Sequence, residues 1–164
     1  MVDGYRGVAV KPGKGVEHAG AVARELREAG CRGDVEVAGL LHDVVEDTTW
    51  TVDDVRTCFG TTVASLVAAV TEDDAIVDYR ARKRALREHI AAAGGDAVDI
   101  ALADKVASLR YVLSAGRKLP KRKRAHYAAV ASLGAHATHP ALAAQVLRLL
   151  AAVDARDKSL AAAG

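Results

Sequence analysis

The stretch Val37-Ala38-Gly39-Leu40-Leu41-His42-Asp43-Val44-Val45-Glu46-Asp47 places four polar side chains directly after an apolar run. Its apolar residues cover much of a helix surface, as in a helix at the centre of a bundle. Burying a charged group is costly unless a counter-ion or a hydrogen-bonding partner offsets that cost. The stretch therefore predicts a buried helix whose polar groups bind a metal or transfer protons.

Helical spacing predicts how these polar groups relate to one another. On a continuous helix from about Asp34 to Glu46, the carboxylates of Asp43, Glu46 and Asp47 share one face, because they lie three and four residues apart. Unpaired, they would repel one another. A cation held by His42 and Asp43 would offset part of this repulsion between the carboxylates. Since neighbouring residues on a helix point about 100° apart, the ion must lie near the helix end.

The rest of the chain also reads as helical. Its 164 residues suffice for one domain with a sizeable core, and 51% of them are apolar, mainly Ala, Val and Leu, which favour helix. Alternating strand patterns are lacking, so we expect an all-α bundle forming one domain over residues 1–164. The helices are expected at 16–29, 34–46, 52–59 (after a capping box at Thr51–Asp54), 62–70, 78–93, 96–113 and, broken near Pro140, 122–155. Residues 1–15 are expected to form a loop.

Composition excludes several classes of protein. The sequence has no apolar run long enough to span a membrane and no apolar signal core at its start. Cys31 and Cys58 lie far apart without a CxxC spacing, which indicates idle thiols in a reducing compartment. The net charge of +2 is too small to imply nucleic-acid binding by itself. We expect a cytoplasmic protein that binds neither membrane nor nucleic acid.

Two further residues are candidates to complete a metal site. His18 lies among apolar residues of the first predicted helix, and Asp104 lies in an apolar stretch of a later one. Two histidines and two aspartates neutralise a divalent ion, and this mixture of ligands suits manganese, iron or zinc. An alternative is that Asp104 is a structural partner of Lys105 or Arg110. Lys105 is its immediate neighbour and is expected to point elsewhere.

These residues also resemble a known family. His18, His42-Asp43 and Asp104 are similar to the H…HD…D signature of the HD-domain metal phosphohydrolases. Leu40 to Thr48 resembles the hydrolase domain of the RelA/SpoT alarmone enzymes and their small, Mesh1-like relatives. Three later segments resemble that branch in the same order: Phe59-Gly60 with the helix after it, the basic helix from Tyr79 to Arg84, and Leu102 to Arg110. The resemblance covers about residues 14–113, and residues 122–155 supply further helices.

The resemblance implies an HD-domain helical bundle with a specific chemistry. Its reaction removes the 3′-pyrophosphate of ppGpp or pppGpp, giving GDP or GTP and pyrophosphate. The substrate partner would thus be a phosphorylated nucleotide and the cofactor Mn²⁺ or another divalent metal. The metal ligands would be His18, His42, Asp43 and Asp104. Glu46 and Asp47 would position the attacking water and exchange protons.

The same resemblance suggests where the substrate binds. The candidate substrate-binding residues are Arg82, Lys83, Lys105, Ser108 and Arg110. Two departures from the family concern the substrate: Ser108 replaces its usual Asn, and the N-terminus lacks its Arg-Lys pair. Arg6, Lys11 and Lys14 are candidates to replace that pair. Tyr111 is interpreted as core rather than as a base-stacking residue.

Other interpretations of the charged and histidine residues stay open. The basic helix and the cluster Arg117 to Arg124 are either solvated surface or phosphate contacts. The remaining histidines are interpreted as structural or exposed: His89, His126, His136 and His139.

Three alternative functions remain. An HD phosphatase would act on another nucleotide, such as a nucleoside monophosphate or NADPH. A non-catalytic module would bind the alarmone without turnover. A di-iron oxygenase needs more histidines between the HD pair and the last Asp, where only His89 lies. Association of the chain with itself is left open.

Overall fold

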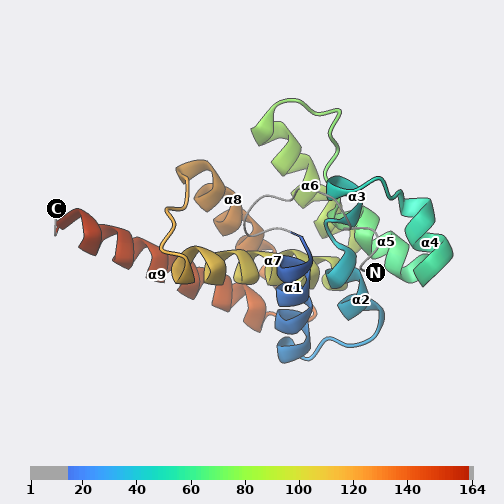
Figure 1. Cartoon of the computed structure of the whole chain (residues 1–164), viewed down its shortest axis with the longest axis horizontal. Helices are drawn as coiled ribbons and strands as arrows, with labels where there is room; N and C mark the ends of the chain where they lie inside the picture. The colour runs from blue at the N-terminus through green and yellow to red at the C-terminus, as the bar shows by residue number, and fades with distance from the viewer. Residues whose placement is uncertain (1–14, 163–164) are drawn as a thin grey trace.

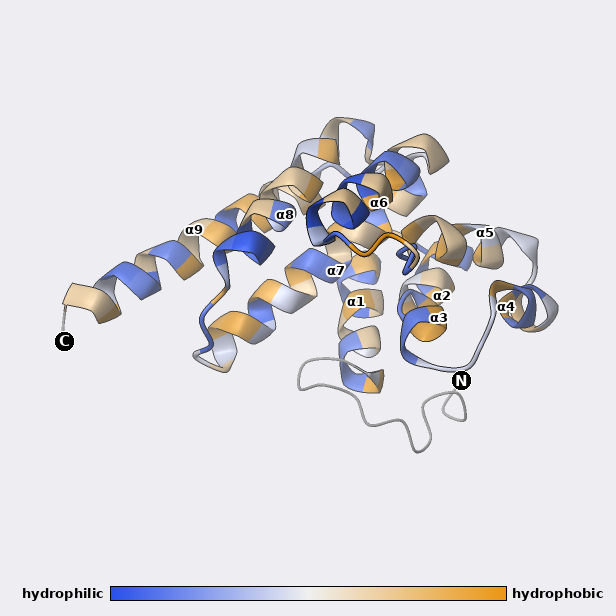
Figure 2. Cartoon of the chain, turned by 90° about the horizontal axis from the view of Figure 1, so that it is seen from above, coloured by the Kyte–Doolittle hydropathy of each residue, from blue (hydrophilic) through white to orange (hydrophobic). Residues whose placement is uncertain are grey.

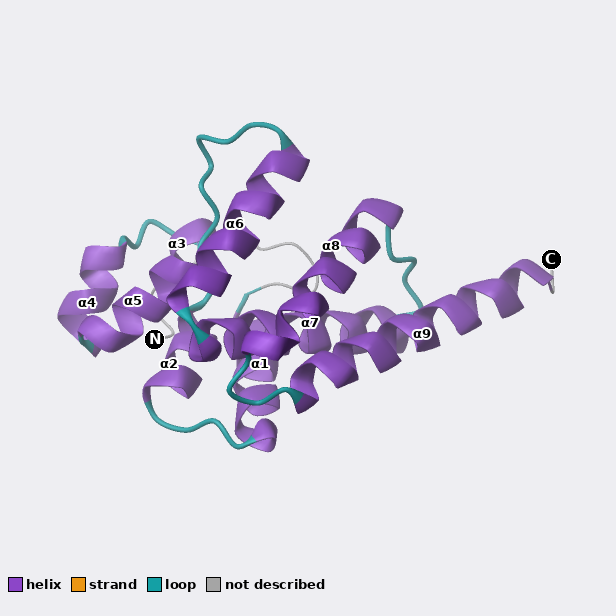
Figure 3. Ribbon diagram, turned by 180° about the vertical axis from the view of Figure 1, so that it is seen from behind, coloured by secondary structure: helices purple, strands orange, loops and turns teal. Residues whose placement is uncertain are grey.

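The computed structural model describes residues 15–162, and over that range the chain forms helices and no strand. Figure 1 shows the helices gathered around α7, with α9 extending beyond the body toward the C-terminus. The view from behind in Figure 3 shows the same all-helical arrangement. The α-helices are α1 (Val16–Ala29), α2 (Asp34–Leu41), α3 (Val44–Asp47), α4 (Val52–Phe59), α5 (Thr61–Val70), α6 (Tyr79–Ala93), α7 (Gly95–Ser114), α8 (Lys121–Ala131) and α9 (Ala141–Ala162). The 3₁₀ helix η2 (Ser132–His136) precedes α9.

The prediction of an all-α fold is confirmed, and most predicted helix boundaries agree within one or two residues. The capping box that opens α4 is present: Thr51 accepts a hydrogen bond from the backbone of Asp54, and Asp54 accepts one from the backbone of Thr51. The last helix runs to Ala162, beyond the expected end near residue 155. Within residues 15–162, no helix is both long enough and apolar enough to cross a membrane. The expected loop at residues 1–15 lies almost wholly outside the described range.

One prediction about the stretch of residues 37–47 is wrong. Residues 34–46 do not form a single helix, because α2 ends at Leu41 and α3 begins at Val44. His42 still has a right-handed helical backbone, but Asp43 leaves it, with φ −99° and ψ 1°. The chain therefore breaks at the His-Asp pair itself. On a continuous helix these two side chains would diverge by about 100°, and the break removes that constraint.

The core forms around α7, which contributes its buried face to contacts with α1, α2, α5, α6 and α9. Its buried apolar residues include Val98, Ile100, Leu102, Val106 and Leu109. Figure 2 shows apolar and polar positions alternating around the helix surfaces, as expected for helices with one side in the core. Because α7 contacts so many partners, a polar residue on it can face groups from several other helices.

A glycine allows α1 and α2 to approach closely. A Cβ atom added to Gly39 of α2 would collide with Cδ1 of Leu26, a fully buried residue of α1. Any larger residue would therefore require a shift of the buried Leu26 side chain or of the two helices. Because His42 follows at the end of α2, this close approach also sets its distance from His18 on α1.

Candidate metal centre and cleft

His42 is held in one orientation by its own helix end. Its Nδ1 atom lies 2.9 Å from the carbonyl oxygen of Gly39. A carbonyl only accepts hydrogen bonds, so Nδ1 must carry the proton and Nε2 presents a lone pair. Nε2 lies 3.2 Å from Oδ1 of Asp43. The break between α2 and α3 thus brings the adjacent His42 and Asp43 side chains to the same place, with Nε2 in the tautomer that binds metal.

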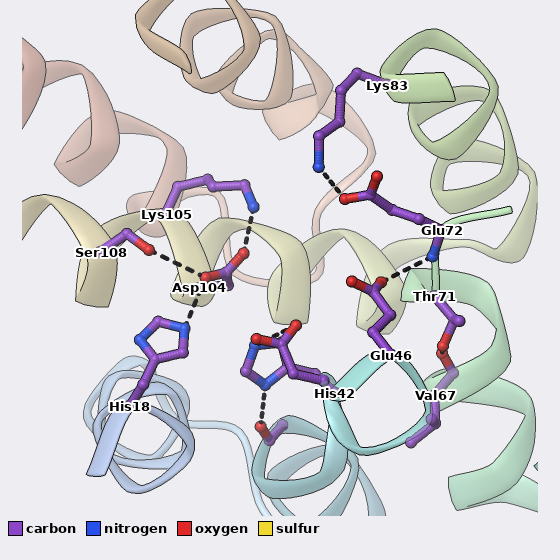
Figure 4. Close-up of polar contacts among 12 residues, drawn as sticks. His18, His42, Glu46, Val67, Thr71, Glu72, Lys83, Asp104, Lys105 and Ser108 are labelled. Atoms are coloured by element: carbon purple, nitrogen blue, oxygen red, sulfur yellow. Dashed lines mark hydrogen bonds and ion pairs between the residues drawn. The ribbon is translucent and has the colours of Figure 1, made fainter. Parts of the chain in front are cut away.

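Two more side chains, from other helices, lie near the His42 ring. Nε2 of His18 on α1 lies 3.0 Å from Oδ1 of Asp104 on α7. The rings of His18 and His42 meet edge to face with centroids 5.3 Å apart. One ligand atom from each of His18, His42 and Asp104 lies within 4.8 Å of the others. Figure 4 shows these side chains converging from separate helices. Residues far apart in the sequence therefore combine into one donor set.

Charges around Asp104 keep its carboxylate ionised. Burial by itself raises the pKa of this group, but Lys105 and the hydrogen bond and charge of His18 outweigh burial and hold the pKa well below its usual range. Lys105 is paired with Oδ2 of Asp104, and Oγ of Ser108 donates to Oδ1 over 3.3 Å. The expectation that Lys105 points away from Asp104 is therefore wrong. Asp104 has the ionised form that a metal ligand needs.

The donor set fits a divalent cation. It offers two imidazoles, one with a fixed tautomer, and the carboxylates of Asp43, which is buried, and Asp104, which is partly buried. His18, His42 and Asp104 converge, Asp43 lies against His42, and all of these except His18 line a cleft. Mixed nitrogen and oxygen ligands of this kind suit first-row divalent ions such as manganese, iron and zinc. The chain therefore has the candidate ligands that a metal-dependent enzyme requires.

A cleft of about 730 Å³ opens beside this centre. Its wall includes His42, Asp43 and Asp104 together with Glu46 and Asp47, so three of the four predicted ligands share one space with the predicted proton-transfer residues. Glu46 is fixed at the cleft edge, because its Oε1 accepts a hydrogen bond of 2.8 Å from the backbone N–H of Glu72. Such a cleft is large enough for a nucleotide-sized ligand.

The predicted substrate-binding residues divide into two groups. Lys83, Lys105 and Ser108 line the cleft. Arg82 does not, since its guanidinium donates to Glu72 over 2.8 Å and to the carbonyl of Ile76 over 2.8 Å. Arg110 is turned away from the cleft and pairs with Glu25 of α1 at 2.8 Å. The structure thus brings only the first group next to the candidate metal centre.

Glu72 links two of these cations. Burial by itself raises the pKa of Glu72, but hydrogen bonds from Lys83 and Arg82 outweigh burial and lower that pKa. The same residue donates its backbone N–H to Glu46. Glu72 therefore positions Lys83 on one side and Glu46 on the other, as Figure 4 shows. Sequence reasoning missed it, because its partners lie 10 to 26 residues away.

Two further residues line the cleft. Tyr111, which the sequence favours as a core residue, is half-buried there. His126, which the sequence favours as structural or exposed, is buried in the cleft wall. Arg87 donates to its Nδ1 over 3.1 Å, so Nε2 carries the ring proton. Nε2 has no hydrogen-bond partner among the described residues.

Positive charge surrounds His126. Burial, followed by the charges of Lys105, Lys83 and Arg87, lowers the pKa of His126 to about 3. At neutral pH the ring is therefore an uncharged hydrogen-bond donor among three cations. Neither periodicity nor motif could have identified it, because only the fold brings α8 beside α6 and α7. Arg6, Lys11 and Lys14, the candidates for the missing Arg-Lys pair, lie outside the described residues.

Comparisons with known proteins agree with this geometry. Residues 11–136 match the family described as the HD domain. The chain is 41% identical over 97 residues to the guanosine-3′,5′-bis(diphosphate) 3′-pyrophosphohydrolase MESH1 of Danio rerio, covering 58% of this chain and 53% of that protein. The human protein of the same name is also 41% identical over 97 residues. The chain thus spans about half the length of the curated relatives that it matches.

Two solved structures share the fold. The crystal structure of lmo0812 from Listeria monocytogenes superposes with a TM-score of 0.70 at 32% identity, covering 81% of this chain and 90% of the other. The structure of a metazoan SpoT ortholog that hydrolyses ppGpp gives a TM-score of 0.65 at 32% identity, covering 82% of this chain and 78% of the other. The similarity therefore includes both the sequence around the candidate site and the arrangement of the helices.

Proposed function

Because this chain belongs to the HD-domain family, we propose that it is a metal-dependent phosphohydrolase that removes the 3′-pyrophosphate of guanosine 3′,5′-bis(diphosphate). The observation that carries the proposal is the convergence of His18, His42 and Asp104 beside a nucleotide-sized cleft. Relatives named for this reaction support the choice of substrate. The products would be GDP, or GTP from the pentaphosphate, and pyrophosphate.

We assign the metal to His18, His42, Asp43 and Asp104. Two carboxylates and two neutral imidazoles balance a divalent charge, and manganese is our choice among the ions that suit this donor set. When bound, such an ion lowers the pKa of a ligated water and offsets negative charge on phosphoryl oxygens. Nδ1 of His42 stays bonded to Gly39 and keeps Nε2 available.

Glu46 and Asp47 are assigned to the attacking water. Both line the cleft beside Asp43, and the bond from Glu72 fixes the Glu46 carboxylate in place. In the proposed reaction, the water oxygen bonds to the phosphorus next to the 3′-oxygen and the bond from phosphorus to that oxygen breaks. A carboxylate that takes the proton from water can return it to the leaving oxygen.

Lys83 and Lys105 are assigned to the phosphate groups. Both line the cleft, and their charges oppose the negative charge that develops on phosphoryl oxygens. Nε2–H of His126, which lacks a partner in the described structure, would donate to a further phosphate oxygen. Arg82 acts through Glu72, so it is a positioning residue, and Ser108 acts through its bond to Asp104. Tyr111 offers a ring on which the base can stack.

The proposal is tested by incubating the protein with ppGpp and Mn²⁺ and measuring GDP and pyrophosphate. We expect both products in equal amounts and their loss in His42→Ala and Asp43→Ala. Leu147→Ala, on the exposed surface of α9, is the control for general damage. Full turnover in either metal-ligand variant would refute the assignment.

The same assay separates the alternatives. Phosphate release from NADPH or a nucleoside monophosphate, without release of pyrophosphate from ppGpp, would replace the proposed substrate. Binding of ppGpp without products in the presence of Mn²⁺ would indicate a non-catalytic module. Parallel reactions with Zn²⁺ and Fe²⁺ test the choice of manganese, since the proposed metal should give the highest rate.

A further inference from the structure

A second group of metal-ligating side chains lies apart from the cleft. Cys31 follows α1, Asp99 belongs to α7, and His139 precedes α9. As in the HD centre, one ligand atom from each lies within 4.8 Å of the others. Asp99 lies five residues before Asp104, which is about 7.5 Å along α7 and about 140° around it. The two aspartates therefore face different sides of the helix.

The distances within this group are close to those in a tetrahedral zinc site. Sγ of Cys31 lies 3.3 Å from Nδ1 of His139 and 3.8 Å from Oδ2 of Asp99, and these two partners lie 2.7 Å apart. Ligand atoms around Zn²⁺ are about 3.3 to 3.6 Å apart, given metal distances of about 2.0 to 2.3 Å. The imidazole and carboxylate need to separate by only about 0.6 Å for the same geometry.

The backbone presents each of these ligands. Gly30, with φ 109°, ends α1 in a Schellman motif in which Cys31 N–H donates to the carbonyl of Leu26. Asp99 accepts the backbone N–H of His139 on Oδ1 over 3.0 Å, which leaves Oδ2 to face the other two ligands. Cys31 and His139 thus lie next to helix ends, and Asp99 lies within α7.

The burial of Asp99 favours binding of a cation. Its side chain is fully buried, and in the described structure it pairs with His139, which is charged only when protonated, and with no lysine or arginine. A divalent ion would place a permanent positive charge next to this buried carboxylate. His139 is the most exposed of the three residues, with 30% of its side chain accessible, so the group is reachable from solvent on that side.

The arrangement does not suit nucleophilic catalysis. In a Cys-His-Asp relay, the thiol and the carboxylate contact different ring nitrogens of the histidine. Here Cys31 and Asp99 both face Nδ1 of His139, and Nε2 lies against Gly30. Two groups that converge on one nitrogen match ligands around a common ion better than a relay.

We propose that Cys31, Asp99 and His139 form a second metal site, selective for zinc or a similarly thiophilic divalent ion, with solvent as the fourth ligand. A thiolate favours such ions, whereas the HD centre offers only nitrogen and oxygen ligands. The bound ion links the end of α1 to α7 and to the start of α9. It replaces the thiol proton of Cys31 and the proton between Asp99 and His139. Its role is structural, and it is independent of the proposed hydrolysis.

Cobalt(II) titration of the whole chain distinguishes the two sites. Cobalt bound to a thiolate gives an intense sulfur-to-metal charge-transfer absorption, which a site of nitrogen and oxygen ligands cannot give. We expect this band to saturate at one equivalent in His42→Ala, where the disabled HD centre does not compete for cobalt, to disappear on addition of zinc, and to be absent in Cys31→Ser. Cys58→Ser is the matched control, because Cys58 is exposed and belongs to no such group.

A thermal measurement keeps the test valid if Cys31→Ser fails to fold. Zinc should raise the melting temperature of His42→Ala, in which the HD centre is disabled, by several degrees, and this shift should vanish when Asp99→Asn is added. The proposal is overturned if the native protein gives no charge-transfer band, if the band persists in folded Cys31→Ser, or if the zinc shift survives Asp99→Asn. The first outcome would leave a hydrogen-bonded trio without metal.

Discussion

Nδ1 of His42 lies 2.9 Å from the carbonyl oxygen of Gly39, three residues earlier in the chain. Gly39 thus orients a candidate metal ligand through its backbone, while the absence of a side chain lets its helix contact Leu26 of α1. Helix packing and metal binding therefore depend on the same residue.

Gly39→Ala should weaken both properties. The added methyl group collides with Leu26, and overpacking of a core costs about 1 to 3 kcal/mol. We also expect lower Mn²⁺ affinity, because moving α2 displaces His42. Thermal unfolding and Mn²⁺ titration provide the measurements. Gly20→Ala is the matched control, since nothing lies within 4 Å of a Cβ atom at that helical position. Equal behaviour of the two variants would contradict the account.

Lys83→Met should raise KM for the nucleotide much more than it lowers the stability of the protein. Lys83 lines the cleft and is held there by Glu72, which keeps Arg82 as a second partner after the change. Loss of one hydrogen bond between charged groups costs about 1.5 to 3 kcal/mol, or about 10- to 100-fold in KM. Steady-state kinetics measures this.

Arg84→Met provides the comparison for that prediction, because Arg84 lies on the same helix and, among the described residues, pairs with the exposed Glu88. Its KM should stay within about twofold of the native value. A similar rise of KM in both variants would mean that general surface charge, and not Lys83, attracts the substrate.

His126→Gln should reduce the loss of stability between pH 7 and pH 5. The pKa of His126 is about 3 in the folded protein, against an ordinary value of 6.5. A lowered pKa favours folding above pH 6.5, and this contribution falls as the pH drops toward 3. At pH 5 the native protein should have lost about 2 kcal/mol through this group.

Urea unfolding at pH 7 and pH 5 measures that difference. His89→Gln serves as the control, because His89 is exposed on α6. The control should lose as much stability as the native protein, whereas His126→Gln should lose about 2 kcal/mol less. If all three proteins lose the same free energy of unfolding between pH 7 and pH 5, His126 is not held neutral by burial.

Arg110→Ala should lower stability without changing KM. Arg110 pairs with Glu25, whose pKa is raised, first by burial, and the arginine opposes that rise. The arginine is half exposed, so we expect a loss of only about 1 kcal/mol. Arg148→Ala, an exposed change on α9, should have no effect on either quantity. A large rise of KM in Arg110→Ala would instead indicate that Arg110 contacts the substrate.

The sequence was sufficient for features that depend on local spacing. Apolar residues at helical intervals located most helices, and the capping box at Thr51 and Asp54 located the start of α4. His18, His42, Asp43 and Asp104 could be selected because polar residues interrupt apolar stretches and resemble a known signature. Their convergence is consistent with that selection, and their role as ligands stays a prediction.

Features that depend on long-range packing could not be predicted. The break at Asp43 has no proline or glycine to mark it, so residues 34–46 read as one helix. The direction of Arg110 depends on Glu25, 85 residues away in the sequence, and His126 enters the cleft wall only because α8 packs beside α7. Lys105 pairs with its immediate neighbour, Asp104. Helical spacing alone predicts that two adjacent side chains point in different directions.

Asp99 and Asp104 lie in adjacent turns of α7, the helix that packs against most of the others. Segments with many buried contacts open only when the whole molecule unfolds, whereas terminal and peripheral helices open locally at lower cost. We therefore expect the amide protons of both aspartates to be among the last to exchange. Fraying of the C-terminal end of α9 should leave the distance between Asp99 and Asp104 unchanged. The HD centre and the Cys31, Asp99 and His139 group should therefore keep their geometry while the outer helices fluctuate.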